Sequence, residues 1–174
     1  MMDRDNEALA DFNAVLQIEP KDAYALESRG ATYRSLNRDN EALADLNAAL
    51  QIDPKNAFAL GIRGATYRSL KRDNEALADL NAALQIDPKD AYALRVRGAT
   101  YQFLKRYNEA LADLNATLQI DPKDAHALGV RGQVYQALER YEEALTDLNQ
   151  AVALDPSLQW AVNDRNQLVQ QMKR

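Results

Sequence analysis

Apolar residues recur along the chain at the spacing of one face of an α-helix. After residue 22, Leu26, Gly30 and Tyr33 fall at positions i, i+4 and i+7. A second run with the helical period begins at Ala42 and continues through Leu46. Two such runs, separated by only a few residues, predict two helices joined by a short turn. The local unit is therefore expected to be a helical hairpin.

The spacing of the prolines indicates that this hairpin is repeated. Each proline follows Glu or Asp, and successive prolines lie at one constant interval, at Pro20, Pro54, Pro88, Pro122 and Pro156. We expect one repeat array over residues 1–174, with no linker, no second domain and about ten helices. Its predicted parts are a half repeat with a second helix only (1–22), four full repeats (23–56, 57–90, 91–124 and 125–158) and a C-terminal capping helix (159–174).

Polar residues mark where these helices are expected to begin. A side-chain oxygen suited to an N-cap stands just before each first helix, at Asp22, Asn56, Asp90 and Asp124. The proline two residues before each cap ends the preceding helix because it has no backbone N–H to donate. The second helices are expected to begin near Asp39, Asp73, Tyr107 and Tyr141, each followed by an early Glu that suits the helix dipole.

A single hairpin of this kind is too small to be stable alone. Burial of its few large apolar side chains does not repay the conformational entropy that the whole hairpin loses on folding. Neighbouring hairpins must supply the missing burial by stacking. The sequence therefore predicts an all-α solenoid whose stability is a sum of local terms.

Several further positions recur in phase in the full repeats. A glycine is followed three residues later by an aromatic residue, at Gly30/Tyr33, Gly64/Tyr67, Gly98/Tyr101 and Gly132/Tyr135. The second helix carries an alanine and then a leucine, at Ala42/Leu46, Ala76/Leu80, Ala110/Leu114 and Ala144/Leu148. This array resembles the tetratricopeptide repeat (TPR) family, although Leu26 and its equivalents stand where that family often has tryptophan. The resemblance implies an α–α superhelix, a right-handed solenoid whose first helices line a concave groove that binds a protein or peptide segment.

Arginine and aspartate recur at positions that lean toward the helix pair. The arginine directly before each glycine is followed sixteen residues later by an aspartate, giving Arg29/Asp45, Arg63/Asp79, Arg97/Asp113 and Arg131/Asp147. Partly buried arginines need partners. We therefore hypothesise a ladder of Arg–Asp pairs, within a hairpin or between neighbours; the alternative is that these side chains are solvated and merely share the period. Asp11 of the half repeat is expected to lean inward as well.

The differences between near-identical repeats indicate where a ligand binds. The second and third full repeats differ at seven places, and five of these lie on one face of the first helix. Selection for a ligand or simple tolerance to change would each produce this pattern. The residues predicted to form the peptide-binding groove are Tyr24, Arg34, Phe58, Ile62, Arg68, Tyr92, Arg95, Val96, Gln102, Phe103, His126 and Val130. The expected partner is a protein or peptide segment with apolar anchors and some acidic character.

Composition excludes several other functions. The chain has no cysteine and one histidine, so we expect no metal and no cofactor. The acids recur at caps and on solvent-facing helices, which favours a structural role over catalysis. A net charge of −5 argues against a nucleic-acid partner. No signal peptide or long apolar stretch is present, so no membrane contact is expected and a cytoplasmic location is the default.

The half repeat suggests a second function. Leu9, Phe12, Val15 and Leu16 lie on a second-type helix and are expected to lack the first helix that would cover them. Either the array is part of a longer one, or residues 1–22 self-associate and make the protein a homo-oligomeric scaffold. Residues 159–174, in contrast, have the apolar and polar faces of a capping helix.

Overall fold

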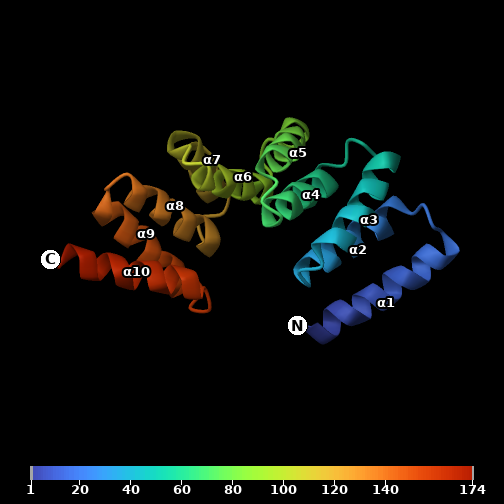
Figure 1. Ribbon diagram of the computed structural model, residues 1–174, viewed down its shortest axis with the longest axis horizontal. Coiled ribbons are helices and arrows are strands. Elements are labelled where there is room, and N and C mark those ends of the chain that lie inside the picture. The colour runs from blue at the N-terminus through green and yellow to red at the C-terminus, as the bar shows by residue number, and fades with distance from the viewer. Residues whose placement is uncertain (1, 174) are drawn as a thin grey trace. The chain divides into compact units, whose positions relative to one another are not determined.

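The computed structural model describes residues 2–173, with side chains from Arg4 onward, and these residues form ten α-helices and no strand (Figure 1). The helices are α1 (Met2–Ile18), α2 (Ala23–Ser35), α3 (Asp39–Ile52), α4 (Ala57–Ser69), α5 (Asp73–Ile86), α6 (Ala91–Phe103), α7 (Tyr107–Ile120), α8 (Ala125–Ala137), α9 (Tyr141–Leu154) and α10 (Gln159–Met172). The predicted all-α fold of about ten helices is confirmed.

The chain forms two compact units, Met1–Pro88 with α1 to α5 and Lys89–Arg174 with α6 to α10. The first unit contains the hairpins α2–α3 and α4–α5, and the second contains α6–α7 and α8–α9. Helix α1 packs on α2 in the first unit, and α10 packs on α9 in the second. Each unit thus builds its core by stacking hairpins. One continuous array over the whole chain stays a prediction.

The first helix of every hairpin begins at the predicted cap. Asp22, Asn56, Asp90 and Asp124 have extended backbones, and each side-chain oxygen accepts a bond from the backbone N–H three residues later. The distance from Ala25 N to Asp22 Oδ1 is 3.0 Å. The second helices begin at Asp39, Asp73, Tyr107 and Tyr141, as predicted.

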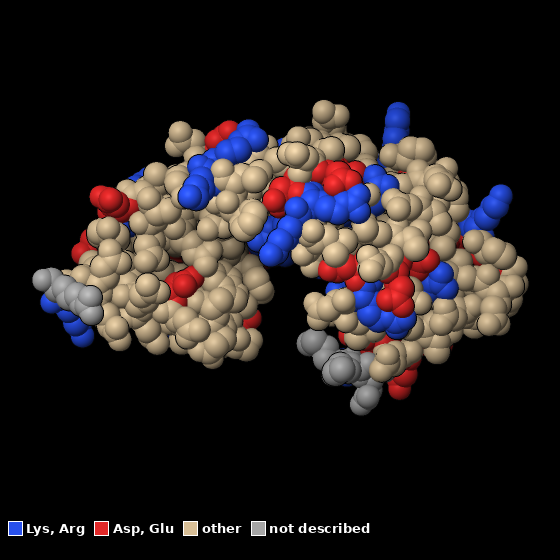
Figure 2. Space-filling model, viewed as in Figure 1, with Lys and Arg blue, Asp and Glu red and all other residues tan. Residues whose placement is uncertain are grey.

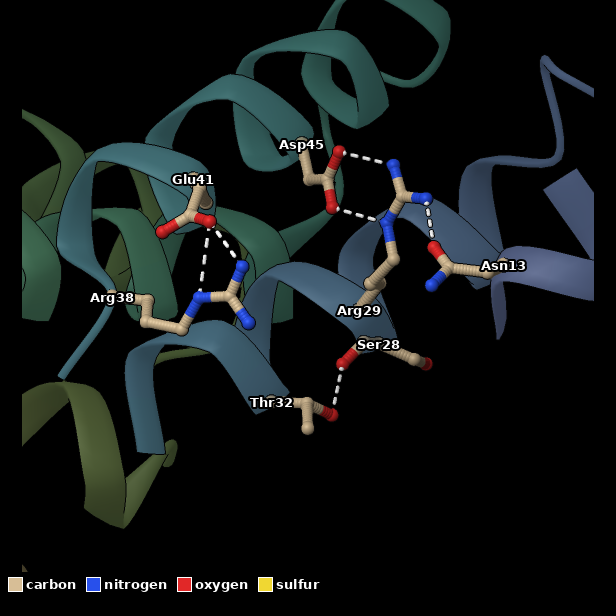
Figure 3. Close-up of polar contacts among 7 residues, drawn as sticks. All are labelled: Asn13, Ser28, Arg29, Thr32, Arg38, Glu41 and Asp45. Carbon is tan, nitrogen blue, oxygen red and sulfur yellow. Dashed lines mark hydrogen bonds and ion pairs between the residues drawn. The ribbon is translucent and has the colours of Figure 1, made fainter. Parts of the chain in front are cut away.

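The turn inside each hairpin needs one residue in the left-handed region. This residue is Asn37, Lys71, Lys105 or Glu139, with φ of 58° to 60°. The arginine that follows this residue contacts both helices of the hairpin. The guanidinium carbon of Arg38 lies 4.4 Å from the centre of the Tyr33 ring. Arg38 also pairs with Glu41 at the start of α3 (Figure 3). Helix α3 begins without a side-chain N-cap bond, and the acidic residues of its first turn, Asp39 and Glu41, suit the helix dipole.

A glycine allows close approach at the centre of each hairpin. A Cβ atom on Gly30 would lie 2.8 Å from Leu46 Cγ, closer than side chains tolerate. The same relation joins Gly64 to Leu80, Gly98 to Leu114 and Gly132 to Leu148. All four leucines are completely buried. The Gly/Leu pair therefore sets the distance between the two helices of a hairpin.

A bidentate ion pair joins the same two helices. Arg29 on α2 donates from Nε and Nη2 to the two carboxylate oxygens of Asp45 on α3, at 2.6 and 2.7 Å (Figure 3). Its Nη1 donates to Asn13 Oδ1 on the preceding helix α1 at 2.7 Å (Figure 3). Asp45 is buried, and its hydrogen bond raises the pKa of Arg29. One arginine therefore connects three helices.

The ion pair recurs in every hairpin, at Arg63–Asp79, Arg97–Asp113 and Arg131–Asp147. The predicted ladder is thus confirmed, with each Arg–Asp pair inside a hairpin. The bond to the preceding helix also recurs, from Arg63 to Asn47 and from Arg131 to Asn115. The asparagine was not predicted as a partner, although it recurs once in every repeat like the aspartate.

Helix α1 is better covered than its sequence predicts. Leu9 and Leu16 are buried, and Leu16 packs with the α2 core together with half-buried Phe12. The expectation of an uncovered face is wrong for these residues because α2 packs along α1. Val15 stays 40% exposed. Asp11 is exposed rather than inward, because the described residues include no first helix before α1 to supply its arginine.

Candidate peptide-binding face

The predicted groove residues lie on the first helices of the hairpins, α2, α4, α6 and α8, at positions that recur with the period of the repeat. Those with the most exposed side chains are Tyr24, Phe58, Arg68, Phe103 and His126. Those that are half-buried are Arg34, Tyr92, Arg95, Gln102 and Val130. Ile62 and Val96 are buried. The set is therefore mixed, and its members differ in what they can offer to a ligand.

Three large aromatic side chains on these helices are exposed to solvent. The exposed fractions are 70% for Tyr24, 51% for Phe58 and 59% for Phe103. Large apolar rings held in water by a rigid helix are typical of contact surfaces, because a partner that covers them gains hydrophobic free energy. Tyr24 and Phe58 belong to the first unit and Phe103 to the second.

Ile62 and Val96 were predicted to form part of the groove surface, but they are buried. Neighbouring first helices contact each other inside each unit, α2 with α4 and α6 with α8. Side chains that point between two such helices become part of the core. Both residues are buried, and a direct contact with ligand stays a prediction.

Arg95 is engaged by its own chain. Its Nε lies 2.9 Å from Asp124 Oδ2, and its guanidinium lies 5.2 Å from the centre of the Tyr92 ring. Asp124 is the N-cap of α8, so this contact joins α6 to the start of the next first helix. Its charge is largely compensated, which weakens the prediction that Arg95 attracts an acidic ligand.

Glu27 holds the repeat position of Arg95 in the first full repeat, and it also contacts the N-cap of the next first helix. Here the residue that reaches the cap accepts the hydrogen bond instead of donating it. Glu27 accepts a hydrogen bond from the Asn56 side chain, and Asn56 is the N-cap of α4. Burial raises the pKa of Glu27, and the bond from Asn56 partly opposes this shift. An aspartate cap here would place a second carboxylate beside Glu27. The identity of the cap, Asn or Asp, therefore matches the residue that reaches it, a pairing that the sequence analysis missed.

Two other kinds of site are absent from the described part of the chain. No group of three or more His, Cys, Asp or Glu side chains among residues 4–173 is arranged to hold a metal ion. None of the ten described helices combines the length and the apolar character that are needed to cross a bilayer.

The sequence matches three family models, each described as tetratricopeptide repeat. They match residues 23–56, 62–130 and 125–158. Together these segments cover most of the chain. A comparison with curated protein sequences finds no match.

Solved structures with a similar fold include several repeat proteins. A thermophilic TPR protein of Thermus thermophilus is 22% identical, with a TM-score of 0.79 over 97% of this chain and 92% of that one. YrrB, a TPR protein with an unusual peptide-binding site, is 24% identical, with a TM-score of 0.70 over 95% and 85%. The first TPR of Spaghetti (RPAP3), bound to the HSP90 peptide SRMEEVD, is 24% identical, with a TM-score of 0.65 over 70% and 97%. At these identities the likeness shows the fold alone, an all-α solenoid.

Proposed function

Because the chain belongs to the tetratricopeptide repeat family, we propose that it is a protein-interaction module that performs no catalysis and binds a polypeptide segment on the face of its first helices. The observation that carries this proposal is the exposure of Tyr24, Phe58 and Phe103 on first helices of the two units. A rigid helix that holds aromatic rings in water is prepared to bind without an ordering cost.

Two similar structures support the class of ligand. YrrB is described by its peptide-binding site, and the Spaghetti repeat is bound to a peptide. For the present chain we propose a segment with apolar anchors that cover the exposed rings. Some acidic character in the ligand remains part of the proposal, because the first helices of the first unit, α2 and α4, together carry four arginines and one glutamate.

A peptide-display selection tests this proposal. Binders are selected from a random library on the wild-type protein and then measured against the variant Tyr24→Ser/Phe58→Ser/Phe103→Ser. The matched control is Ile52→Ser/Ile86→Ser/Ile120→Ser, because these isoleucines are each 45% exposed but lie at the ends of second helices. We expect the aromatic variant to lose at least tenfold in affinity and the control to keep its affinity. Equal losses in both variants would place the binding surface elsewhere.

Self-association through residues 1–22 is the second candidate function. Val15 holds the repeat position of Ala49, Ala83, Thr117 and Ala151. These four residues are buried, but Val15 is 40% exposed. A second copy that covers α1 would bury it. Light scattering across a concentration series tests this: we expect Val15→Ser to lower the average mass if the chain associates, and a concentration-independent monomer mass would exclude it.

A further inference from the structure

Residues of α10 hold the same repeat positions as residues of the first helices, although α10 was predicted only as a capping helix. Trp160 lies one repeat period after His126, and Asp164 lies one repeat period after Val130. Trp160 therefore holds the same repeat position as Tyr24, Phe58, Tyr92 and His126. We call the surface formed by His126, Val130 and Gln133 of α8 with Trp160 and Asp164 of α10 the α8–α10 face. It lies entirely within the second unit.

The indole of Trp160 is held against the backbone of α8. A Cβ atom on residue 129 would lie 2.4 Å from Trp160 Cη2, so only glycine leaves room for the ring there. The His126 ring lies 6.3 Å from the indole, centre to centre, at an interplanar angle of 48°. Trp160 is half-buried and His126 is exposed. The ring is therefore fixed in place while part of it remains open to a ligand.

The carboxylate of Asp164 is also fixed. Its Oδ2 accepts a hydrogen bond of 2.6 Å from Gln133 Nε2 on α8. Its other oxygen, Oδ1, takes part in no hydrogen bond or ion pair among the described residues. Asp164 and Trp160 are four residues apart on one helix, so their side chains share a face. A carboxylate oxygen and an indole are thus presented side by side.

One arginine on each of α6, α8 and α10 is engaged by another side chain. Arg95 is paired with Asp124, and Arg131 is paired with Asp147. Arg165 donates to Asn166 Oδ1 at 2.9 Å and lies one residue after Asp164, about 100° further around the helix. Figure 2 shows isolated acidic side chains in a largely uncharged surface over α10. The charge of Asp164 is therefore left to act on a ligand.

We propose that the α8–α10 face is a subsite for a cationic side chain, a lysine ammonium or an arginine guanidinium, of the bound polypeptide. The cation donates a charge-assisted hydrogen bond to Asp164 Oδ1 and lies against the indole of Trp160, where cation–π attraction adds to the ion pair. This inference deepens the proposed function and rests on it: the polypeptide that the module binds carries a basic residue that reaches the α8–α10 face.

Fluorescence of Trp160 tests the subsite directly, because this is the single tryptophan in the chain. The probes are Nα-acetyl-arginine amide and Nα-acetyl-lysine amide, with the neutral isostere Nα-acetyl-citrulline amide as control. Free N-acetyltryptophanamide corrects for collisional quenching. We expect a saturable change with both cationic probes that weakens as salt is added, and no saturable change with citrulline. Saturation by only one of the two cations would identify which side chain the subsite takes.

The variant Asp164→Asn removes the charge and keeps an acceptor for Gln133, so we expect it to weaken binding of the cationic probes about tenfold. Glu142→Gln is the matched control, because it removes one acidic charge from an exposed residue of α9, away from this face. Equal responses to arginine and citrulline, or no saturable response to either, overturn the subsite even if Asp164→Asn does not fold. Neither result affects the outcome of the experiment on Tyr24, Phe58 and Phe103. The proposed function is therefore tested independently of the subsite.

Discussion

Replacing Arg131 by leucine tests the energetic role of the ion-pair ladder. In the wild type, Arg131 bonds Asp147 through two nitrogens at 2.7 and 2.8 Å and Asn115 through a third at 2.8 Å. The substitution leaves the carboxylate of Asp147, whose side chain is only 6% exposed, without its counter-charge. Stranding a fully buried charge costs about 3–5 kcal/mol. Because the Arg131 side chain is itself 20% exposed, some water reaches the site, and we expect a loss of about 2–4 kcal/mol.

The double variant Arg131→Leu/Asp147→Leu separates the pair from its parts. With both charges gone, no buried group is stranded, so we expect the double variant to be more stable than Arg131→Leu alone. The coupling between the two sites should be about 1–3 kcal/mol. Arg140→Leu is the matched control, because Arg140 pairs with Glu143 on the surface, where the two side chains are 44% and 49% exposed. Its midpoint of unfolding should stay close to that of the wild type.

Urea unfolding followed by circular dichroism provides the measurement, and Trp160 fluorescence reports on α10 in the same unit. A loss of about 2–4 kcal/mol corresponds to a midpoint lower by about 1–2 M urea. The reasoning would be refuted if Arg131→Leu unfolded at the same urea concentration as Arg140→Leu. It would also be refuted if the double variant lost as much stability as Arg131→Leu and the single variant Asp147→Leu lose in sum.

Three further predictions concern stability. Lys71 has φ of 59°, a region that favours glycine, so Lys71→Gly should raise stability by about 0.5–1 kcal/mol, seen as a higher melting temperature. The raised pKa of Glu27 means that the folded state holds its proton more tightly, so its contribution to stability is present below pH 4.5 and is lost as pH rises through the folded pKa. Glu27→Gln should therefore unfold at higher urea than wild type at pH 7 and equally at pH 4; the opposite order would contradict the raised pKa. Gly132→Ala places Cβ 2.8 Å from Leu148 Cγ, and overpacking should cost about 1–3 kcal/mol in the same urea assay, so an unchanged midpoint would show that the leucine moves aside.

The helices and their caps were predictable because they depend on short stretches of chain. An N-cap such as Asp22 bonds an N–H group three residues away, and the proline that ends the preceding helix acts on its own backbone. Repetition at a constant interval then places every later helix once one hairpin has been recognised. These signals do not require knowledge of the tertiary structure.

The ladder was predictable in part. Recurrence identified arginine and aspartate as partners but left open whether they meet within one hairpin or between neighbours. In the structure each arginine pairs with the aspartate of its own hairpin. Arg63, which bonds Asp79, also donates to Asn47 on the preceding helix. The reason is reach: a guanidinium with several N–H donors at the boundary of three helices can serve two acceptors at once.

The candidate face was predictable only as a set of positions. Helical periodicity placed Tyr24 and Ile62 on nearby stripes of their helices. It did not show that Tyr24 remains exposed and Ile62 becomes buried when α2 and α4 are in contact. It also did not show that Asp124 compensates Arg95 or that Trp160 of α10 lies on the backbone of α8.

Local chemistry and a regular period thus specify where every hairpin of this protein begins, turns and ends. Which side chains remain open to a partner follows from contacts between helices, and these join residues far apart in the chain, such as Glu27 with Asn56 and Gln133 with Asp164. Such contacts depend on how closely two helix surfaces approach. That distance is set by packing volume, for example by a glycine facing a leucine, and it becomes known only when the helices are placed side by side.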